Sequence, residues 1–168
     1  ENVIIDVVGN QLTMSPALNF YGTADISVAV SDGEFTDSEI FEFVVNSVND
    51  APILAEVGAV TTDEDTPLTI ALSASDVDGD DLIFSAQSYS ENNVSVNVVG
   101  DQLTLIPALN FNGAVTISVT GTDNGNLSSE ASFLLTVAPV NDSPTITLPE
   151  SFTFAEDDSL VEDFTQYI

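Results

Sequence analysis

The stretch VVGDQLTLIPALNFNG, residues 98–113, decides the fold, because nearly the same stretch occurs earlier in the chain. There it reads VVGNQLTMSPALNFYG, at residues 7–22, an offset of 91 residues. VNDAP at residues 48–52 also returns, as VNDSP at residues 140–144, now at an offset of 92. Self-similarity at a fixed spacing is the mark of a tandem array. The chain is therefore built from repeats of roughly 92 residues.

Within each repeat, apolar and polar residues alternate with a period of two. Val94, Val96 and Val98 enclose polar side chains, and the same alternation recurs around residues 115–119. Such alternation predicts β-strands with one buried face. Gly-Asp at residues 100–101 lies between two alternating runs and predicts a two-residue hairpin. No helical periodicity extends beyond a single turn.

The repeat length and the strand spacing together predict an all-β fold of tandem Greek-key β-sandwiches in a linear array. In the complete repeat the expected strands lie at residues 59–63, 67–73, 82–88, 94–99, 102–106, 114–121 and 132–138. We expect three parts: the back half of one repeat (1–50), a complete repeat (51–144) and the first strands of a third (145–168). The abrupt start at Glu1 suggests a segment of a longer array.

The chain has 168 residues with 28 acidic and no basic side chains, giving a formal charge of −28. Side-chain salt bridges are therefore impossible, and each carboxylate must face water, accept hydrogen bonds or bind a cation. A hydrophobic content of 43% still permits a packed core. Nucleic acid and anionic membranes are poor partners for such a surface, because both require Lys or Arg. Without cysteine, disulfides and thiolate metal sites are excluded too.

The acidic charge is most concentrated in DVDGDD, residues 76–81. Asp76, Asp78 and Asp80 alternate there, so their like charges repel unless a cation lies between them. Ca2+ takes six to eight oxygen ligands in flexible geometry, which a loop can supply. The stretch is not an EF-hand, because its glycine and its twelfth residue do not match that motif. From these residues alone, a calcium site and a solvated acidic turn are both open.

The repeated motifs resemble the cadherin-like tandem repeats of large bacterial surface adhesins. VNDAP, at residues 48–52, is similar to the linker that joins cadherin domains. The pair Asp76 and Asp78 before Gly79 resembles the cadherin D-x-D motif, and Thr122-Asp123 resembles its A-x-D motif. The cadherin L-D-R-E element is replaced by Leu-Asn-Phe-Tyr at residues 18–21, which removes two carboxylates. The resemblance thus implies fewer ions per junction than in animal cadherins.

Carried over residue by residue, the resemblance implies Ca2+ at the junctions between repeats. It implies one complete site, before the complete repeat, formed by Asn49, Asp50, Glu64, Asp76, Asp78 and Asp123, with Asp80 and Asn19 as additions. A partial second site would contain Asn141, Asp142 and Glu156.

The sequence therefore predicts a non-enzymatic, extracellular structural extender of a fibrous adhesin or biofilm matrix, rigidified by Ca2+ and partnered by neighbouring repeats. Two alternatives remain open. One is a filament subunit in which residues 145–168 supply strands to the leading half-repeat of another copy. The other is a polysaccharide-binding module. Glycosidase chemistry is disfavoured because the repeat offers no evident cleft between two separated carboxylates.

Overall fold

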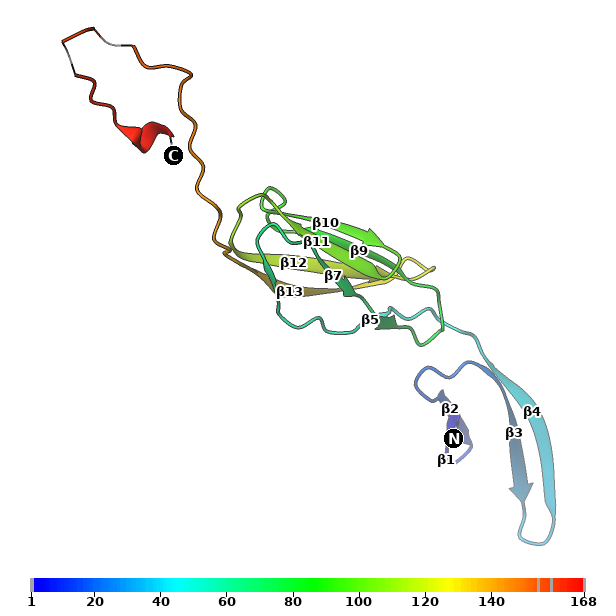
Figure 1. Cartoon of the computed structure of the whole chain (residues 1–168). Helices are drawn as coiled ribbons and strands as arrows, with labels where there is room; N and C mark the ends of the chain where they lie inside the picture. The colour runs from blue at the N-terminus through cyan, green and yellow to red at the C-terminus, as the bar shows by residue number, and fades with distance from the viewer. Residues whose placement is uncertain (1, 154, 158, 168) are drawn as a thin grey trace.

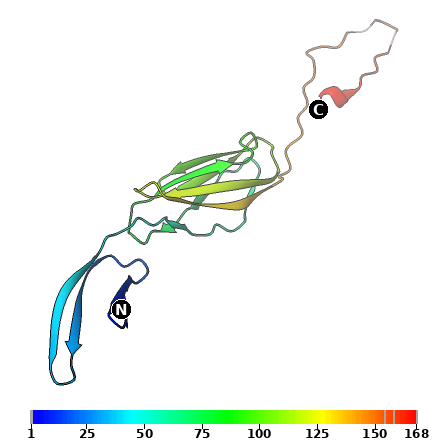
Figure 2. The ribbon, with the colours of Figure 1, turned by 180° about the vertical axis from the view of Figure 1, so that it is seen from behind.

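The computed structural model describes residues 2–153, 155–157 and 159–167. It shows three parts in a row (Figure 1): two β-hairpins, a central β-sandwich and a tail. The hairpins and the tail lie at opposite ends of the sandwich, as the view from behind also shows (Figure 2). We call the hairpin region (residues 2–50) the half-repeat, residues 51–144 the central repeat and residues 145–167 the tail.

The central repeat is a sandwich of a four-stranded and a three-stranded sheet. The four-stranded sheet has the order β6-β13-β12-β9, and the three-stranded sheet has the order β10-β11-β7. Short β5 and β8 pair at one edge. The bounds are β5 Ile53–Leu54, β6 Val60–Asp63, β7 Leu68–Ala71, β8 Ala74–Ser75, β9 Ile83–Ser88, β10 Val94–Val99, β11 Gln102–Pro107, β12 Gly113–Thr122 and β13 Ser128–Ala138.

Alternating side chains of the two sheets meet in one core. Leu103 and Leu105 of β11 are fully buried and lie in the same core as Ile117 of β12 and Leu135 of β13. Burying a side chain of this size stabilises the fold by about 1.5–3 kcal/mol. The core is therefore held by the residues whose period-two pattern predicted it.

One pairing departs from the antiparallel pattern, because β6 runs parallel to β13. Val60 lies opposite Leu135, and Asp63 lies opposite Ala138 at the last residue of β13. The chain then continues from β6 into Glu64, whose backbone N–H donates to the carbonyl of Ala138 (2.8 Å). This pairing places Glu64 at the end of the sandwich where β13 finishes.

The half-repeat consists of two separate hairpins. The strands are β1 Val3–Val8, β2 Gln11–Pro16, β3 Gly22–Ser31 and β4 Thr36–Val45, paired β1-β2 and β3-β4. They correspond in sequence to β10–β13. Among the described residues of the tail there is no strand, and one 3-10 turn spans Phe164–Tyr167.

The structure confirms the all-β sandwich and the seven expected strands, each within a few residues. The two-residue hairpin predicted at residues 100–101 is present, and so is its counterpart at residues 9–10: Gly100 and Gly9 have φ values of 62° and 61°. Glycine adopts this left-handed conformation without steric cost. The sequence missed the two-residue strands β5 and β8. The stretch FAEDDSL at residues 154–160 is a weaker copy of TDEDTPL at residues 62–68, and its Phe154 and Asp158 lie outside the described residues.

Candidate calcium-binding junction

Three segments converge where the half-repeat meets the central repeat. These are the linker after β4, the loop between β8 and β9 (residues 76–82) and the loop between β12 and β13 (residues 123–127). Six of the predicted ligands belong to these segments: Asn49, Asp50, Asp76, Asp78, Asp80 and Asp123. We call this group the junction cluster.

Asp78 ties the 76–82 loop to the linker. One of its oxygens, Oδ2, accepts a hydrogen bond from the backbone N–H of Asp50 at 2.7 Å. The backbone N–H of Asp78 in turn donates to Asp76 Oδ1 at 2.8 Å. This second contact is an Asx turn, in which an Asp side chain bonds the backbone two residues on. The Asx turn thus holds the Asp76 carboxylate, and the linker N–H holds the Asp78 carboxylate, before any ion binds.

Asp123 ties the 123–127 loop to the same linker. It is only 4% exposed, and its Oδ1 accepts from the backbone N–H of Leu127 at 2.8 Å. Its Oδ2 accepts from the side-chain amide of Asn49, also at 2.8 Å. Asn49 therefore turns its amide nitrogen to Asp123, which leaves its own oxygen available for other contacts.

The pKa of Asp80 shows the effect of the negative charges that surround it in the cluster. Partial burial raises the pKa of this carboxyl above its ordinary 3.8, and neighbouring negative charges raise it further. Those charges are Asp76, Asp123, Asp78 and Asp81, in order of effect. Since each raises the pKa through repulsion, these carboxylates destabilise the ionised form of Asp80. A cation among them would remove this repulsion.

Asp76 provides the test of whether the cluster fits a cation. Its Oδ2 is buried, with no hydrogen-bond partner among the described residues. A buried carboxylate oxygen without a partner is costly. The surrounding donors are all carboxylate and amide oxygens, the hard ligands that Ca2+ prefers. The donor chemistry and the orphaned oxygen fit Ca2+, although no three carboxylates among the described residues stand in ready-made metal geometry.

Glu64 is not part of this cluster, contrary to the grouping expected from the sequence. It is 6% exposed, and its Oε1 accepts from the backbone N–H of Val140 at 2.6 Å. Val140 follows the last residue of β13, whereas Asp123 precedes the first. The 11 residues of β13 span about 33 Å. The parallel β6–β13 pairing therefore carries Glu64 to the far end of the central repeat.

The far end carries the residues of the predicted second site. Asn141 and Asp142 are exposed directly after β13, and Asn141 Nδ2 donates to the Asp142 carbonyl at 3.1 Å. Asn49 makes the matching contact with the Asp50 carbonyl at 3.5 Å. Glu156 is exposed in the tail. The structure thus places Glu64 beside this linker.

Two further residues shape the junction. Asn19 lines a groove with Asp50 and Asp76, which agrees with its position as a possible addition to the site. Gly125 was missed by the sequence analysis. A Cβ at this position would lie 2.6 Å from Asn49 Nδ2, so a larger residue here would have to displace the Asn49 amide. The Asp-Asn-Gly-Asn run at residues 123–126 signals a turn but does not reveal that contact.

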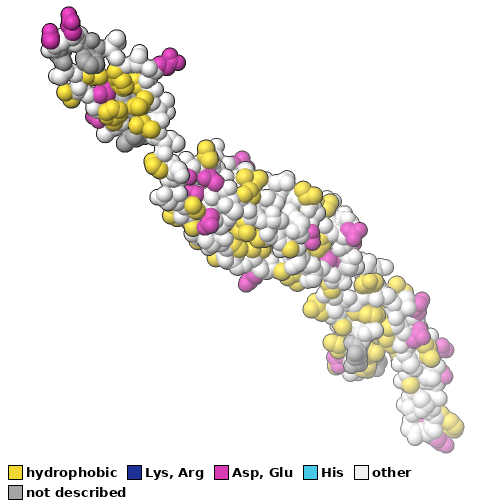
Figure 3. All heavy atoms as spheres, in the orientation of Figure 1, with side chains coloured by type: hydrophobic (Ala, Val, Ile, Leu, Met, Phe, Trp, Pro, Cys, Tyr) yellow, Lys and Arg dark blue, Asp and Glu magenta, His cyan; other side chains and the backbone are white. Residues whose placement is uncertain are grey.

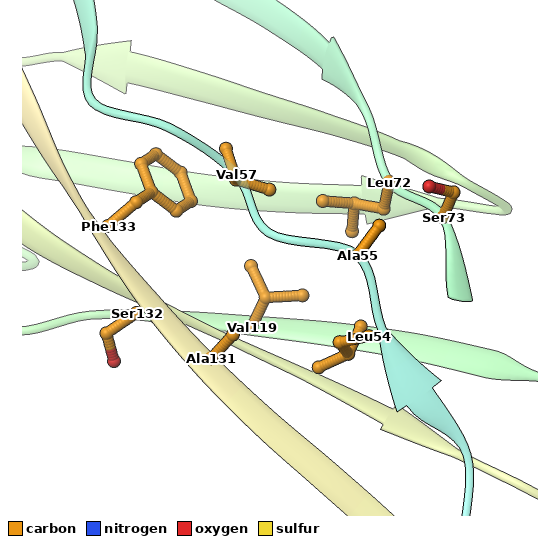
Figure 4. Close-up of a pocket in the computed structure, with 9 residues that line it drawn as sticks. All are labelled: Leu54, Ala55, Val57, Leu72, Ser73, Val119, Ala131, Ser132 and Phe133. Atoms are coloured by element: carbon orange, nitrogen blue, oxygen red, sulfur yellow. The ribbon is translucent and has the colours of Figure 1, made fainter. Parts of the chain in front are cut away.

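One small pocket inside the sandwich has no room for a substrate. That pocket lies between the segment after β5 and the core side of β12 and β13, with Val57, Leu72 and Phe133 around it (Figure 4). Its cavity volume is about 10 Å³, the lower limit for a single water molecule. Among the described residues, no helix is both long and apolar enough to cross a membrane.

The bacterial Ig domain family matches residues 49–136, which is more than half of the chain. The chain belongs to the bacterial Ig domain family. The match begins at Asn49 in the linker and ends within β13, so it covers the central sandwich. A search of curated proteins found no match.

Solved cadherin structures share the fold. Extracellular cadherin domains 1–5 of protocadherin gamma B2 align with a TM-score of 0.51 and 14% identity, covering 86% of this chain and 35% of that one. Domains 1–4 of protocadherin gamma B7 align with a TM-score of 0.50 and 16% identity, covering 93% and 44%. This chain therefore spans less than half of either structure. The family match and these structures confirm the predicted bacterial, cadherin-like Ig fold.

Proposed function

We propose that this bacterial Ig-like segment is a non-enzymatic extender of an extracellular fibrous adhesin or matrix protein, rigidified by Ca2+ between its repeats. Its division into a half-repeat, a complete repeat and the opening of a third is part of the proposal. The neighbouring repeats are its partners in this role.

The proposed mechanism is electrostatic. The Asp side chains of the junction cluster, with Asn49 as a further oxygen donor, would hold Ca2+. The ion supplies positive charge where the chain has no basic side chain to do so. Because Asn49 and Asp50 belong to the linker and the other ligands belong to the central repeat, one ion would connect both. Without the ion, carboxylate repulsion loosens the linker; with it, the half-repeat takes a fixed orientation.

The observation that carries the proposal is the buried Oδ2 of Asp76, which no hydrogen-bond donor within the described part of the chain reaches. It lies in a cluster whose carboxylates raise the pKa of Asp80 by repulsion. A solvated acidic turn would instead expose its oxygens to water. The linker hydrogen bonds to Asp78 and Asp123 further favour a junction site over an isolated loop.

Thermal melting with and without Ca2+ tests the proposal. Extracellular calcium modules bind at about 10⁻⁴ to 10⁻³ M. Free Ca2+ at ten to a hundred times Kd stabilises a site by about 1.4–2.7 kcal/mol. For a domain of this size we expect the Tm to rise by about 5–20 °C. The double variant Asp76→Asn with Asp78→Asn should lose this rise.

Two controls isolate the site from general charge screening. NaCl at matched ionic strength should raise the Tm much less than Ca2+ does. Glu91→Gln removes one exposed carboxylate beyond the far end of β9 and should keep the full rise with Ca2+. A rise that survives in the double variant would show that the ion binds elsewhere.

A further inference from the structure

The loop between β12 and β13 carries an Asn-Gly pair, Asn124 and Gly125, beside the junction cluster. In such a pair the backbone nitrogen of the glycine can attack the asparagine side chain, because glycine has no Cβ to obstruct the approach. The sequence contains one other such pair, Asn112 and Gly113. The two pairs share the same chemistry, so the surrounding fold decides which of them reacts.

The backbone at Asn124 can take up the reactive geometry. Asn124 and Gly125 are both exposed, and nothing in the described part of the chain hydrogen-bonds to the Gly125 N–H or to the Asn124 side chain. The loop is closed by its outer residues instead. The N–H of Asp123 donates to the Leu127 carbonyl (3.0 Å), and the N–H of Leu127 donates to Asp123 Oδ1 (2.8 Å). The attacking nitrogen and the side chain that it attacks take no part in these bonds.

The other Asn-Gly pair is held by the sheet. Gly113 is the first residue of β12 and lies opposite Val137 of β13, so strand pairing fixes its backbone. Attack on Asn112 would require the backbone between Asn112 and Gly113 to bend into a ring, which strand pairing resists. The fold therefore favours reaction at Asn124 over reaction at Asn112.

We propose that Asn124 is a site of spontaneous deamidation. The Gly125 nitrogen attacks Cγ of Asn124, so a C–N bond forms, and the side-chain amide leaves as ammonia with the proton that the Gly125 nitrogen gives up. Water then opens the resulting cyclic imide. Opening at Cγ gives aspartate, whereas opening at the backbone carbonyl carbon breaks the original peptide bond and gives isoaspartate. Water is the only co-reactant.

Both products add a carboxylate next to Asp123 of the junction cluster. The chain has no basic side chain that could pair with the new charge. The space-filling view shows acidic side chains along the molecule and no basic side chain among them (Figure 3). A further like charge beside Asp123 increases the repulsion within the cluster. Deamidation thus changes the charge at the point where the linker is attached.

Isoaspartate also changes the backbone, because it inserts the β-carbon of residue 124 into the chain. The loop has little room for this, since a Cβ on Gly125 would lie 2.6 Å from Asn49 Nδ2. A shift of Gly125 would displace the Asn49 amide from Asp123, whose Oδ2 accepts from it at 2.8 Å. The isoaspartate product should therefore loosen the linker, whereas the aspartate product keeps the original backbone.

Mass spectrometry of the full 168-residue chain, incubated in mildly alkaline buffer with chelator, tests the proposal. Proteolysis before aspartate separates the two Asn-Gly pairs, because it yields the fragments 101–122 and 123–141. We expect a mass gain of about 1 Da in fragment 123–141, with isoaspartate located at residue 124. No gain in that fragment, or an equal gain in fragment 101–122, overturns the proposal.

Two matched variants locate the reaction. Asn124→Gln should lose the mass gain in fragment 123–141, because a glutamine side chain would have to form a larger and less favoured ring. Asn112→Gln is its control, since it alters the other Asn-Gly pair and should leave that gain unchanged. A gain that persists in Asn124→Gln would place the modification at another residue and overturn the assignment.

Calcium-dependent melting tests the effect on the linker, which rests on the proposed function, whereas the deamidation does not. A chain enriched in isoaspartate should show a smaller Tm rise with Ca2+ than the fresh chain. Asn124→Asp adds the charge alone and should keep the full rise, because negative charge favours a bound cation. An undiminished rise in the isoaspartate form overturns the loosening of the linker.

The two proposals fail separately. Deamidation at Asn124 in a chain without any Ca2+ response would support the modification site and contradict the proposed function. A Ca2+ response in a chain whose Asn124 stays intact would do the reverse.

Discussion

At the scale of single residues, the junction cluster depends on how each carboxylate uses its two oxygens. Asp76 and Asp78 each give one oxygen to a backbone N–H, and Asp123 gives one to Leu127. These hydrogen bonds hold the side chains in place before an ion binds, so ion binding costs little further side-chain entropy. The negative charge of these carboxylates is not neutralised by the hydrogen bonds, and the chain has no basic side chain to neutralise it.

Protons and Ca2+ should compete at Asp80. Its pKa is raised in the folded protein, so its ionised form costs stability above that pKa, and the cost is relieved as the pH falls through it. In chelator, this group therefore favours the folded state more at acidic pH than at neutral pH. The Tm rise caused by Ca2+ should shrink as the pH falls from 7 toward the raised pKa. Melting curves across that pH range check this.

Asp80→Asn serves as the control for that measurement. It removes the titrating group, so the Tm of the protein in chelator should be higher at neutral pH and should depend less on pH. An unchanged pH profile would mean that other carboxylates dominate the titration.

Glu64 should matter for stability but not for the junction cluster. Glu64→Ala removes a buried acceptor and leaves the N–H of Val140 without its partner, a loss of about 1.5–3 kcal/mol. Glu64→Gln keeps an acceptor oxygen and should cost less. Urea unfolding measures both. In either variant, the part of the Ca2+ response that depends on Asp76 and Asp78 should persist; its loss would contradict the structure.

At the scale of elements, the β12–β13 hairpin both builds the core and positions the linker. Its strands bury Ile117 and Leu135, while its loop holds Asn49 through Asp123. In the half-repeat, the β3–β4 loop has Asp32 at the matching position. Backbone N–H groups of Phe35 and Glu34 bond this carboxylate and lower its pKa. The hairpin loop is thus an Asp-stabilised turn in both copies.

Gly125→Ala should disrupt the contact between this hairpin loop and the linker. The added Cβ would lie 2.6 Å from Asn49 Nδ2 and displace that side chain from Asp123. We expect a reduced Tm rise with Ca2+ and little change in the core. Gly58→Ala is the matched control, because a Cβ there meets nothing within 4 Å and the φ is ordinary. Calcium-dependent melting of both variants makes the comparison.

At the scale of the whole molecule, the proposed role depends on the angle between the half-repeat and the central repeat. The link between them consists of the linker and its bonds to Asp78 and Asp123. A chain with 28 like charges resists compaction, and Ca2+ at the junction would replace repulsion with a fixed connection. Stacked junctions of this kind would make a stiff rod.

Distance measurements between spin labels should show that stiffening. The native chain has no cysteine, so Glu34→Cys and Asn97→Cys provide two exposed labelling sites, one on each side of the junction. In chelator the distance distribution should be broad, and Ca2+ should narrow it. With Asp76→Asn and Asp78→Asn added, it should stay broad. Equal widths in every condition would argue against a calcium-fixed junction.

The sequence by itself determined the repeat, the strands and most of the junction cluster. Period-two alternation is local, so it located β10 to β13 without tertiary information. The Asp residues of the 76–82 loop and the linker were found because their motifs repeat. Their clustering with Asp123 agrees with the resemblance to cadherin-like repeats.

Only the tertiary structure decided the place of Glu64 and the contact that Gly125 makes with Asn49. Glu64 lies closer in sequence to the 76–82 loop than Asp123 does, yet the parallel β6–β13 pair places it at the opposite end of β13, a strand about 33 Å long. Gly125 matters only because the linker folds against it. Strand pairing depends on contacts between residues that are distant in sequence, and local sequence patterns do not encode those contacts.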